Sequence, residues 1–172
     1  MALVAVQAEL SFGQAAKPVL KDHRTGANAL SNSSANDALV GSWYVTLNSV
    51  TSPAPFKAMI TFSEGGGVVG SAQGDILLTA PPGVPPLATA VHGAWERTAN
   101  REYLFTFRQI FYNGDGSYAG GAKIRNAVTL DRTGNEMSGN LIVRYYDSND
   151  EVVFTGTGTF TAVRIVAEPM TP

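Results

Sequence analysis

Strict alternation of side chains along residues 102–112, EYLFTFRQIFY, constrains this chain more than any other feature. In an extended strand, successive side chains point to opposite faces, so every second residue of this stretch shares one face. That face carries four aromatic rings and one amide: Tyr103, Phe105, Phe107, Gln109 and Phe111. Aromatic side chains in such a row must be shielded from water, either in a packed core or in the lumen of a small barrel. A single amide among them is more typical of a ligand cavity than of a purely structural core.

The same period-two pattern recurs on both sides of this stretch and predicts seven further strands. We expect them at about residues 40–48, 56–62, 68–73, 93–97, 118–130, 137–146 and 152–164. The turns between strands carry Gly, Asn and Asp, and NGDGS at residues 113–117 is the strongest hairpin signal. Residues 74–91 contain four prolines, which cannot donate to a strand ladder, and are therefore predicted to form a loop that gates the lumen.

Eight strands joined mainly by short turns predict an all-β protein, an eight-stranded antiparallel up-and-down barrel without free edges. A two-sheet sandwich is the alternative fold. Gly156 and Gly158 lie on the inward face of the last strand and suit a tight barrel corner, which favours the barrel. We place the barrel domain at residues 39–172. Residues 1–38 lack strand alternation and are predicted to be an N-terminal arm, irregular or partly helical.

The composition excludes several kinds of site and partner. The chain has no Cys, and one of its two His residues lies in the arm, so we expect neither a metal site nor a cofactor. With a net charge of −2, the chain has no extended positive potential that would attract nucleic acid. There is no run of roughly 20 apolar residues, so no membrane span is expected. Since no signal-peptide pattern is recognisable, we expect a soluble protein, cytoplasmic rather than secreted.

Gly41-Ser42-Trp43 in the first strand, together with Arg164 near the end of the last, resembles the signature of lipocalin-like (calycin) barrels. The resemblance spans about residues 39–166. It implies a structural role for both residues, with Trp43 closing one end of the barrel and Arg164 lying across the indole. The chain departs from secreted lipocalins in having no disulfide and no long helix pattern after the last strand. It also has a weaker resemblance to allene oxide cyclase-like barrels, which include cyclases that fold a polyene in a dry lumen.

The inward faces supply the candidate ligand-binding residues. They are Tyr103, Phe105, Phe107, Gln109, Phe111, Asn126, Phe56, Leu141 and Phe154. Gln109 and Asn126 are the informative members, because an unpaired buried amide costs roughly 1 to 3 kcal/mol. They either bond to each other or to buried water, or they anchor an otherwise apolar ligand.

Four residues are candidate catalytic groups. Tyr118 and Tyr145 are expected on the inward face near strand ends, where each could donate a proton. His92 and Glu96 share a face of one strand, and a His beside a carboxylate could act as a general base. The alternative for His92 is a loop residue at the barrel rim.

The sequence supports three functions. The first is binding of a small, mostly apolar molecule in the lumen. The second is a cofactor-free cyclase or isomerase that holds a flexible polyene or polyketide-like substrate in a reactive shape. The third is a filled barrel whose outer face mediates assembly, for example as a homodimer through the Thr row of the last strand and Tyr44, Tyr112 and Tyr146.

Overall fold

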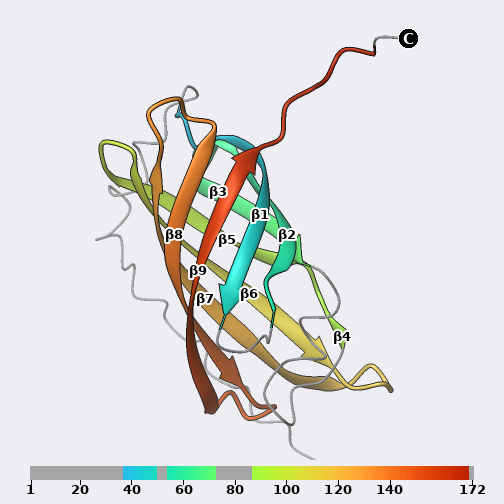
Figure 1. The fold of residues 1–172 in the computed structure, drawn as a ribbon. Coiled ribbons are helices and arrows are strands. Elements are labelled where there is room, and N and C mark those ends of the chain that lie inside the picture. The colour runs from blue at the N-terminus through green and yellow to red at the C-terminus, as the bar shows by residue number, and fades with distance from the viewer. Residues whose placement is uncertain (1–36, 50–53, 73–86, 171–172) are drawn as a thin grey trace, which may run out of the picture.

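The computed structural model describes residues 37–49, 54–72 and 87–170, which form a closed antiparallel β-barrel (Figure 1). Its elements are β1 (Gly41–Ser49), β2 (Phe56–Phe62), the 3-10 turn η1 (Glu64–Gly66), β3 (Gly67–Ala72), β4 (Leu87–Ala88), β5 (Val91–Ala99), β6 (Glu102–Tyr112), β7 (Tyr118–Leu130), β8 (Glu136–Tyr146) and β9 (Val152–Arg164). The eight long strands pair in sequence order, and β9 returns to pair with β1. The prediction of an eight-stranded up-and-down barrel is therefore confirmed.

The short strand β4 corrects the predicted loop. Leu87 and Ala88 pair with the end of β6, on the edge that β5 also occupies. Thr89 continues this ladder, because its backbone N–H donates to the carbonyl of Ile110 at 3.0 Å and its hydroxyl accepts from the Ile110 N–H at 3.2 Å. The loop prediction is wrong at Leu87, Ala88 and Val91, since β6 is long enough to hold both β4 and β5. Residues 73–86 lie outside the described residues, so the gating role stays a prediction.

The predicted turns at the ends of β2 and β6 are confirmed. In the NGDGS segment, Asn113 N–H donates to the carbonyl of Ser117 at 3.0 Å, and Gly116 takes the positive φ of 83° that this tight connection requires. Between β2 and β3, Gly65 and Gly66 have φ values of 83° and 91°. Both turns use backbone conformations that residues with a Cβ adopt only at a cost.

The inward rows of the strands form one continuous core. Tyr103, Phe105, Phe107 and Phe111 are all buried, as the alternation along β6 predicts. Phe105 contacts Phe62 edge-on, with ring centroids 5.1 Å apart, and also contacts Phe107 and Phe160. The Thr row of β9 is exposed on the outer face, again as predicted.

Tyr118 and Val152 were both expected on the inward rows but are exposed. The Tyr118 side chain is 43% exposed, and its hydroxyl donates to Asp150 Oδ1 at 2.8 Å on the outer surface. The register of β6 and β7 shifts between Phe111 and Tyr112, and Gly120 adopts a φ of 124°. This irregularity changes which side chains of β7 face inward, so the prediction that Tyr118 shares the inward face of Ala122 is wrong.

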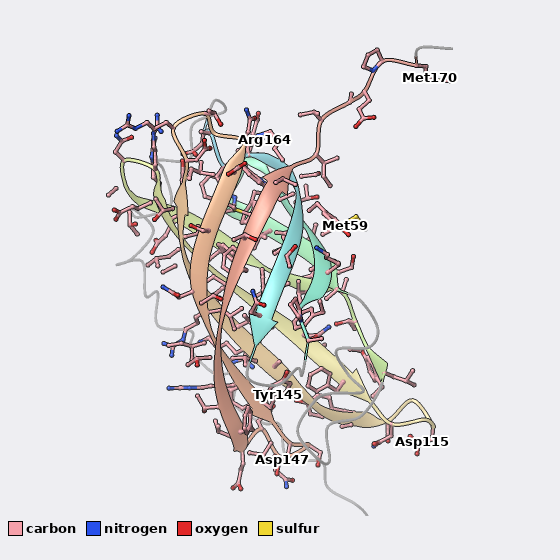
Figure 2. All side chains as sticks on the ribbon, viewed as in Figure 1. Met59, Asp115, Tyr145, Asp147, Arg164 and Met170 are labelled. Carbon is pink, nitrogen blue, oxygen red and sulfur yellow. The ribbon has the colours of Figure 1, made fainter. Side chains whose placement is uncertain are left out.

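The two ends of the barrel differ. Arg164 and the extended C-terminal residues lie at one end, whereas Tyr145, Asp147 and Asp115 lie at the other (Figure 2). The first of these is called the base here, and the second the mouth. None of the described segments contains a helix of the length and apolarity needed to cross a bilayer.

Candidate functional site

The base of the barrel is closed by Trp43 and Arg164. Trp43 is fully buried, and its indole N–H donates to the carbonyl of Leu39 at 3.0 Å. The Arg164 guanidinium lies over the indole, 4.3 Å from the ring centroid. It also donates to the carbonyls of Val40 at 2.8 Å, Gly134 at 3.0 Å and Ala38. The guanidinium thus ties the start of β1 to the β7–β8 turn and seals this end against solvent.

Asp37 adds a buried acid to the base that sequence reasoning missed. It was assigned to the N-terminal arm, but it is only 5% exposed. Its Oδ1 accepts a 2.6 Å hydrogen bond from the Tyr103 hydroxyl, while Oδ2 lies 3.7 Å from Arg97 and accepts no hydrogen bond from the described residues. Burial and the hydrogen bond to this carboxylate raise the pKa of Tyr103 to about 12. Tyr103 therefore stabilises the base and does not line the cavity.

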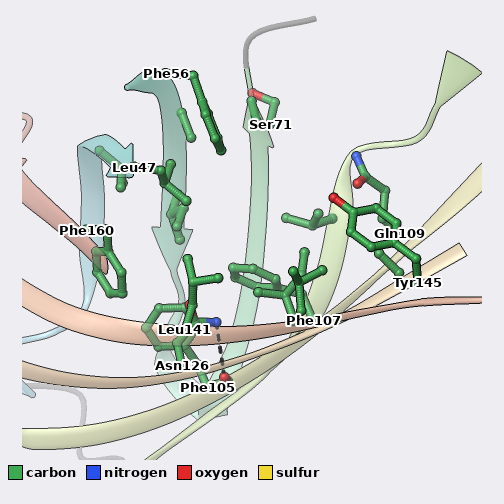
Figure 3. Close-up of a pocket in the computed structure, with 18 residues that line it drawn as sticks. Leu47, Phe56, Ser71, Phe105, Phe107, Gln109, Asn126, Leu141, Tyr145 and Phe160 are labelled. Carbon is green, nitrogen blue, oxygen red and sulfur yellow. Dashed lines mark hydrogen bonds between the residues drawn. The ribbon is translucent and has the colours of Figure 1, made fainter. Parts of the chain in front are cut away.

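A cavity of about 90 Å³ occupies the lumen between this base and the mouth (Figure 3). Its wall is mainly aliphatic and aromatic, with polar atoms from Ser71, Gln109, Asn126 and Tyr145. It extends to Ser71 and Ala72, whose side chains are exposed at the end of β3. The barrel is thus packed at its base and hollow toward its mouth. This volume holds several water molecules, and it is smaller than the roughly 150 Å³ engineered cavity that accommodates benzene.

The structure brings most of the candidate ligand-binding residues to this cavity. Those that line it are Phe56, Phe105, Phe107, Gln109, Asn126 and Leu141. Tyr103, Phe111 and Phe154 do not line it. Phe111 stacks on Tyr145, with centroids 5.9 Å apart, and Tyr145 in turn contacts Phe154 at 6.0 Å. These three rings form an aromatic cluster beside the mouth, so Phe111 and Phe154 support Tyr145 instead of lining the cavity. The binding role of all nine residues stays a prediction.

The two inward amides do not bond to each other. Gln109 Nε2 donates to the backbone carbonyl of Thr89 at 2.8 Å, and Asn126 Nδ2 donates to that of Phe105 at 3.4 Å. Gln109 is half-buried, lines the cavity as Tyr145 does (Figure 3) and holds the link between β4 and β5. Asn126 is 5% exposed and lies among Phe105 and Leu141. The wall therefore has one amide near the mouth and one at depth.

Of the four candidate catalytic residues, only Tyr145 lines the cavity. His92 and Glu96 are exposed on the outer face of β5, where His92 is part of a strand and not of a loop. Tyr118 is bound to Asp150 at the surface. The structure therefore does not bring the four together, and their catalytic roles stay predictions. In the part of the chain that the structure describes, no three His, Asp or Glu residues gather as they would around a metal ion.

Sequence reasoning named only part of the cavity wall. The remaining lining residues are Val45, Leu47, Ala58, Ile60, Ser71, Ala72, Val91, Ala122, Ile124, Val143 and Phe160. Most lie on the predicted inward rows, and the alternation that identified Phe105 would have identified them. Ser71 and Ala72 could not be found in this way, because adjacent residues of a strand point to opposite faces and both border the cavity only at the strand's end.

Comparison with known protein families, with curated proteins and with solved structures finds no match to this chain.

Proposed function

We propose that the barrel binds a small, mostly apolar molecule in its lumen. The observation that carries this proposal is the apolar cavity of about 90 Å³ above a sealed base. A core that served stability alone would gain by filling this space, because each missing side-chain contact lowers the free energy of unfolding. The closed ring and the Trp43–Arg164 stack also support the proposed relationship to lipocalin-like barrels, which is a relationship of architecture.

A cyclase or isomerase has weaker support. Such an enzyme would need a polarising group inside the lumen and room to fold its substrate. Tyr145 is the one candidate catalytic residue on the wall, and a polyene exceeds the volume of the cavity unless side chains move. The structure therefore favours binding over catalysis. Once a ligand is identified, incubating the chain with it and analysing the products tests for enzymatic turnover.

Assembly through the outer face stays a separate prediction. The Thr row of β9 is exposed, and so is Tyr44, whose ring lies 5.3 Å from Lys57 Nζ. These features fit a solvated face as well as an interface. Light scattering on the purified chain measures the oligomeric state directly.

The test of lumen binding begins with native mass spectrometry of the gently purified chain, followed by identification of any small molecule released from it. The matched variants are Ala122→Leu and Ala127→Leu. Ala122 lines the cavity, whereas Ala127 is exposed on the same strand. We expect the three extra carbon atoms at position 122 to fill the space and abolish binding of toluene, while the variant at position 127 binds it normally. Toluene binding that survives in a folded Ala122→Leu variant would contradict the proposal.

A further inference from the structure

The described part of the cavity wall carries no formal charge. None of the described residues that line it is Asp, Glu, Lys, Arg or His. A charged group that enters such a space loses its hydration and finds no partner of opposite sign, so the charged form of a ligand is strongly disfavoured. The wall therefore selects against carboxylates and ammonium groups, including the head group of an ionised fatty acid.

Asn126 and Tyr145 are the two polar side chains of the described wall that are almost fully buried, and Asn126 is the amide of the pair. Its NH₂ group donates to the carbonyl of Phe105, and because that partner is an acceptor, the orientation of the amide is fixed. The side-chain oxygen Oδ1 then points away from this bond, and no described residue donates to it. Among the described residues, Asp37 Oδ2 is the only fully buried polar side-chain atom without a partner, so Asn126 Oδ1 remains accessible to a water-sized molecule and can accept a hydrogen bond from a ligand donor.

Gln109 does not duplicate this arrangement. Its NH₂ group makes a shorter bond, 2.8 Å to the carbonyl of Thr89, and its side chain is only half-buried. An amide in that position can exchange its remaining bonds with water near the mouth. Asn126 lies deeper, among Phe105 and Leu141, and is the stronger candidate for a specific contact.

We propose that the ligand is an uncharged molecule with one hydrogen-bond donor, such as a hydroxyl group, on an otherwise apolar body, and that Asn126 Oδ1 accepts its hydrogen bond. The donor end lies deep in the lumen, and the apolar body extends toward the mouth. The cavity volume of about 90 Å³ is smaller than the roughly 150 Å³ cavity that encloses benzene, so a ligand of ring size occupies it with its donor end and extends toward the open side at Ser71 and Ala72. This inference rests on the proposed lumen binding and adds to it the charge, the polar group and the orientation of the ligand.

The experiment uses three probes of similar shape: phenol, toluene and benzoate. Toluene replaces the hydroxyl of phenol with a methyl group, and benzoate carries a charge at neutral pH. Affinities are measured by NMR titration of the full chain, of Asn126→Leu and of Asn140→Leu. Asn140 is an exposed residue on the outer face of β8 and serves as the matched control. We expect Asn126→Leu to lower the affinity for phenol relative to toluene by about five- to tenfold. The control should leave that ratio unchanged, and benzoate should not bind at concentrations at which phenol saturates.

The outcomes separate this inference from the proposed function. If toluene binds but the phenol-to-toluene ratio is the same in Asn126→Leu, lumen binding stands and the role of Asn126 is overturned. If benzoate binds as tightly as phenol, the requirement for an uncharged ligand is overturned. If none of the three probes binds, both proposals fail. Should Asn126→Leu not fold, the comparison of phenol with benzoate on the unmodified chain decides whether the ligand must be uncharged. Magnetisation transfer between the phenol ring and Leu141, which pairs with Asn126, then decides where the ring lies, and the absence of transfer would overturn the role of Asn126.

Discussion

Replacing Arg164 with Met removes the guanidinium that closes the base while it keeps an unbranched side chain over Trp43. The change deletes hydrogen bonds to the carbonyls of Ala38, Val40 and Gly134, each worth about 0.5 to 1.5 kcal/mol net. It also removes the cation–π contact with the indole, worth about 0.5 to 2 kcal/mol. Together these contacts predict a loss of about 2 to 6 kcal/mol in the free energy of unfolding. For a chain of this length, that loss lowers the melting temperature by roughly 5 to 20 °C.

Urea unfolding followed by tryptophan fluorescence measures this loss, since Trp43 is fully buried in the folded chain. The control is Arg144→Met, which removes an exposed guanidinium from the outer face of β8 and should change the free energy of unfolding by less than about 0.5 kcal/mol. If the two variants were equally stable, the guanidinium would not close the base and the hydrophobic core alone would hold it. A variant at position 164 that lost stability but kept toluene binding would show that base closure and the cavity are independent.

Two further predictions concern titratable groups. Because burial and the bond to Asp37 raise the pKa of Tyr103 to about 12, the folded chain holds this proton more tightly than the unfolded chain does. The contribution of this proton to the free energy of unfolding is fully present below pH 10 and falls by about 1.4 kcal/mol per pH unit between pH 10 and pH 12. Tyr103→Phe has no such proton, so its alkaline denaturation should not show this fall. Hydrogen bonds from Thr133 hold the pKa of Asp131 well below its usual range, so its stabilising effect is present above about pH 4 and lost on further acidification. The protection of the amides in the Asp131–Glu136 turn against hydrogen exchange, measured relative to the intrinsic exchange rate at each pH, should fall on acidification and should be low at all pH values in Asp131→Ala; unchanged protection in that variant would contradict this assignment.

Alternation predicted the barrel because most of its strands are regular. Along β6, the ladder to β7 runs from Glu102 to Phe111 without interruption, so every second side chain faces inward as expected, and all of these except the half-buried Gln109 are buried. The same rule failed at Tyr118, where a register shift and the positive φ of Gly120 interrupt the period. The sequence of residues 118–121, YAGG, does not determine where such an irregularity occurs, because its position depends on pairing with the neighbouring strands.

The sequence predicts many of the residues that line the cavity, but it does not predict the volume of the cavity. The inward rows that contain Phe105, Phe107 and Asn126 follow from the sequence, and the cavity lies between them. Its size depends on rotamers and on the coiling of the whole sheet, neither of which leaves a local pattern. Asp37 was missed for a related reason, since its burial depends on Tyr103 and Arg97, which are distant in the sequence.

The pairing of β1 with β9 has a consequence for how the chain folds. Trp43 lies opposite Arg164, so the seam joins residues more than a hundred positions apart. On the ribosome, β1 emerges first and has no partner on this side until β9 has been made. Closing so long a loop is entropically slow, and contacts of such long range are typical of chains that fold in milliseconds to seconds. Until the seam closes, the inner face is open along its length, so a ligand of the proposed kind that is present during synthesis would be enclosed by the folding chain without passing through the mouth.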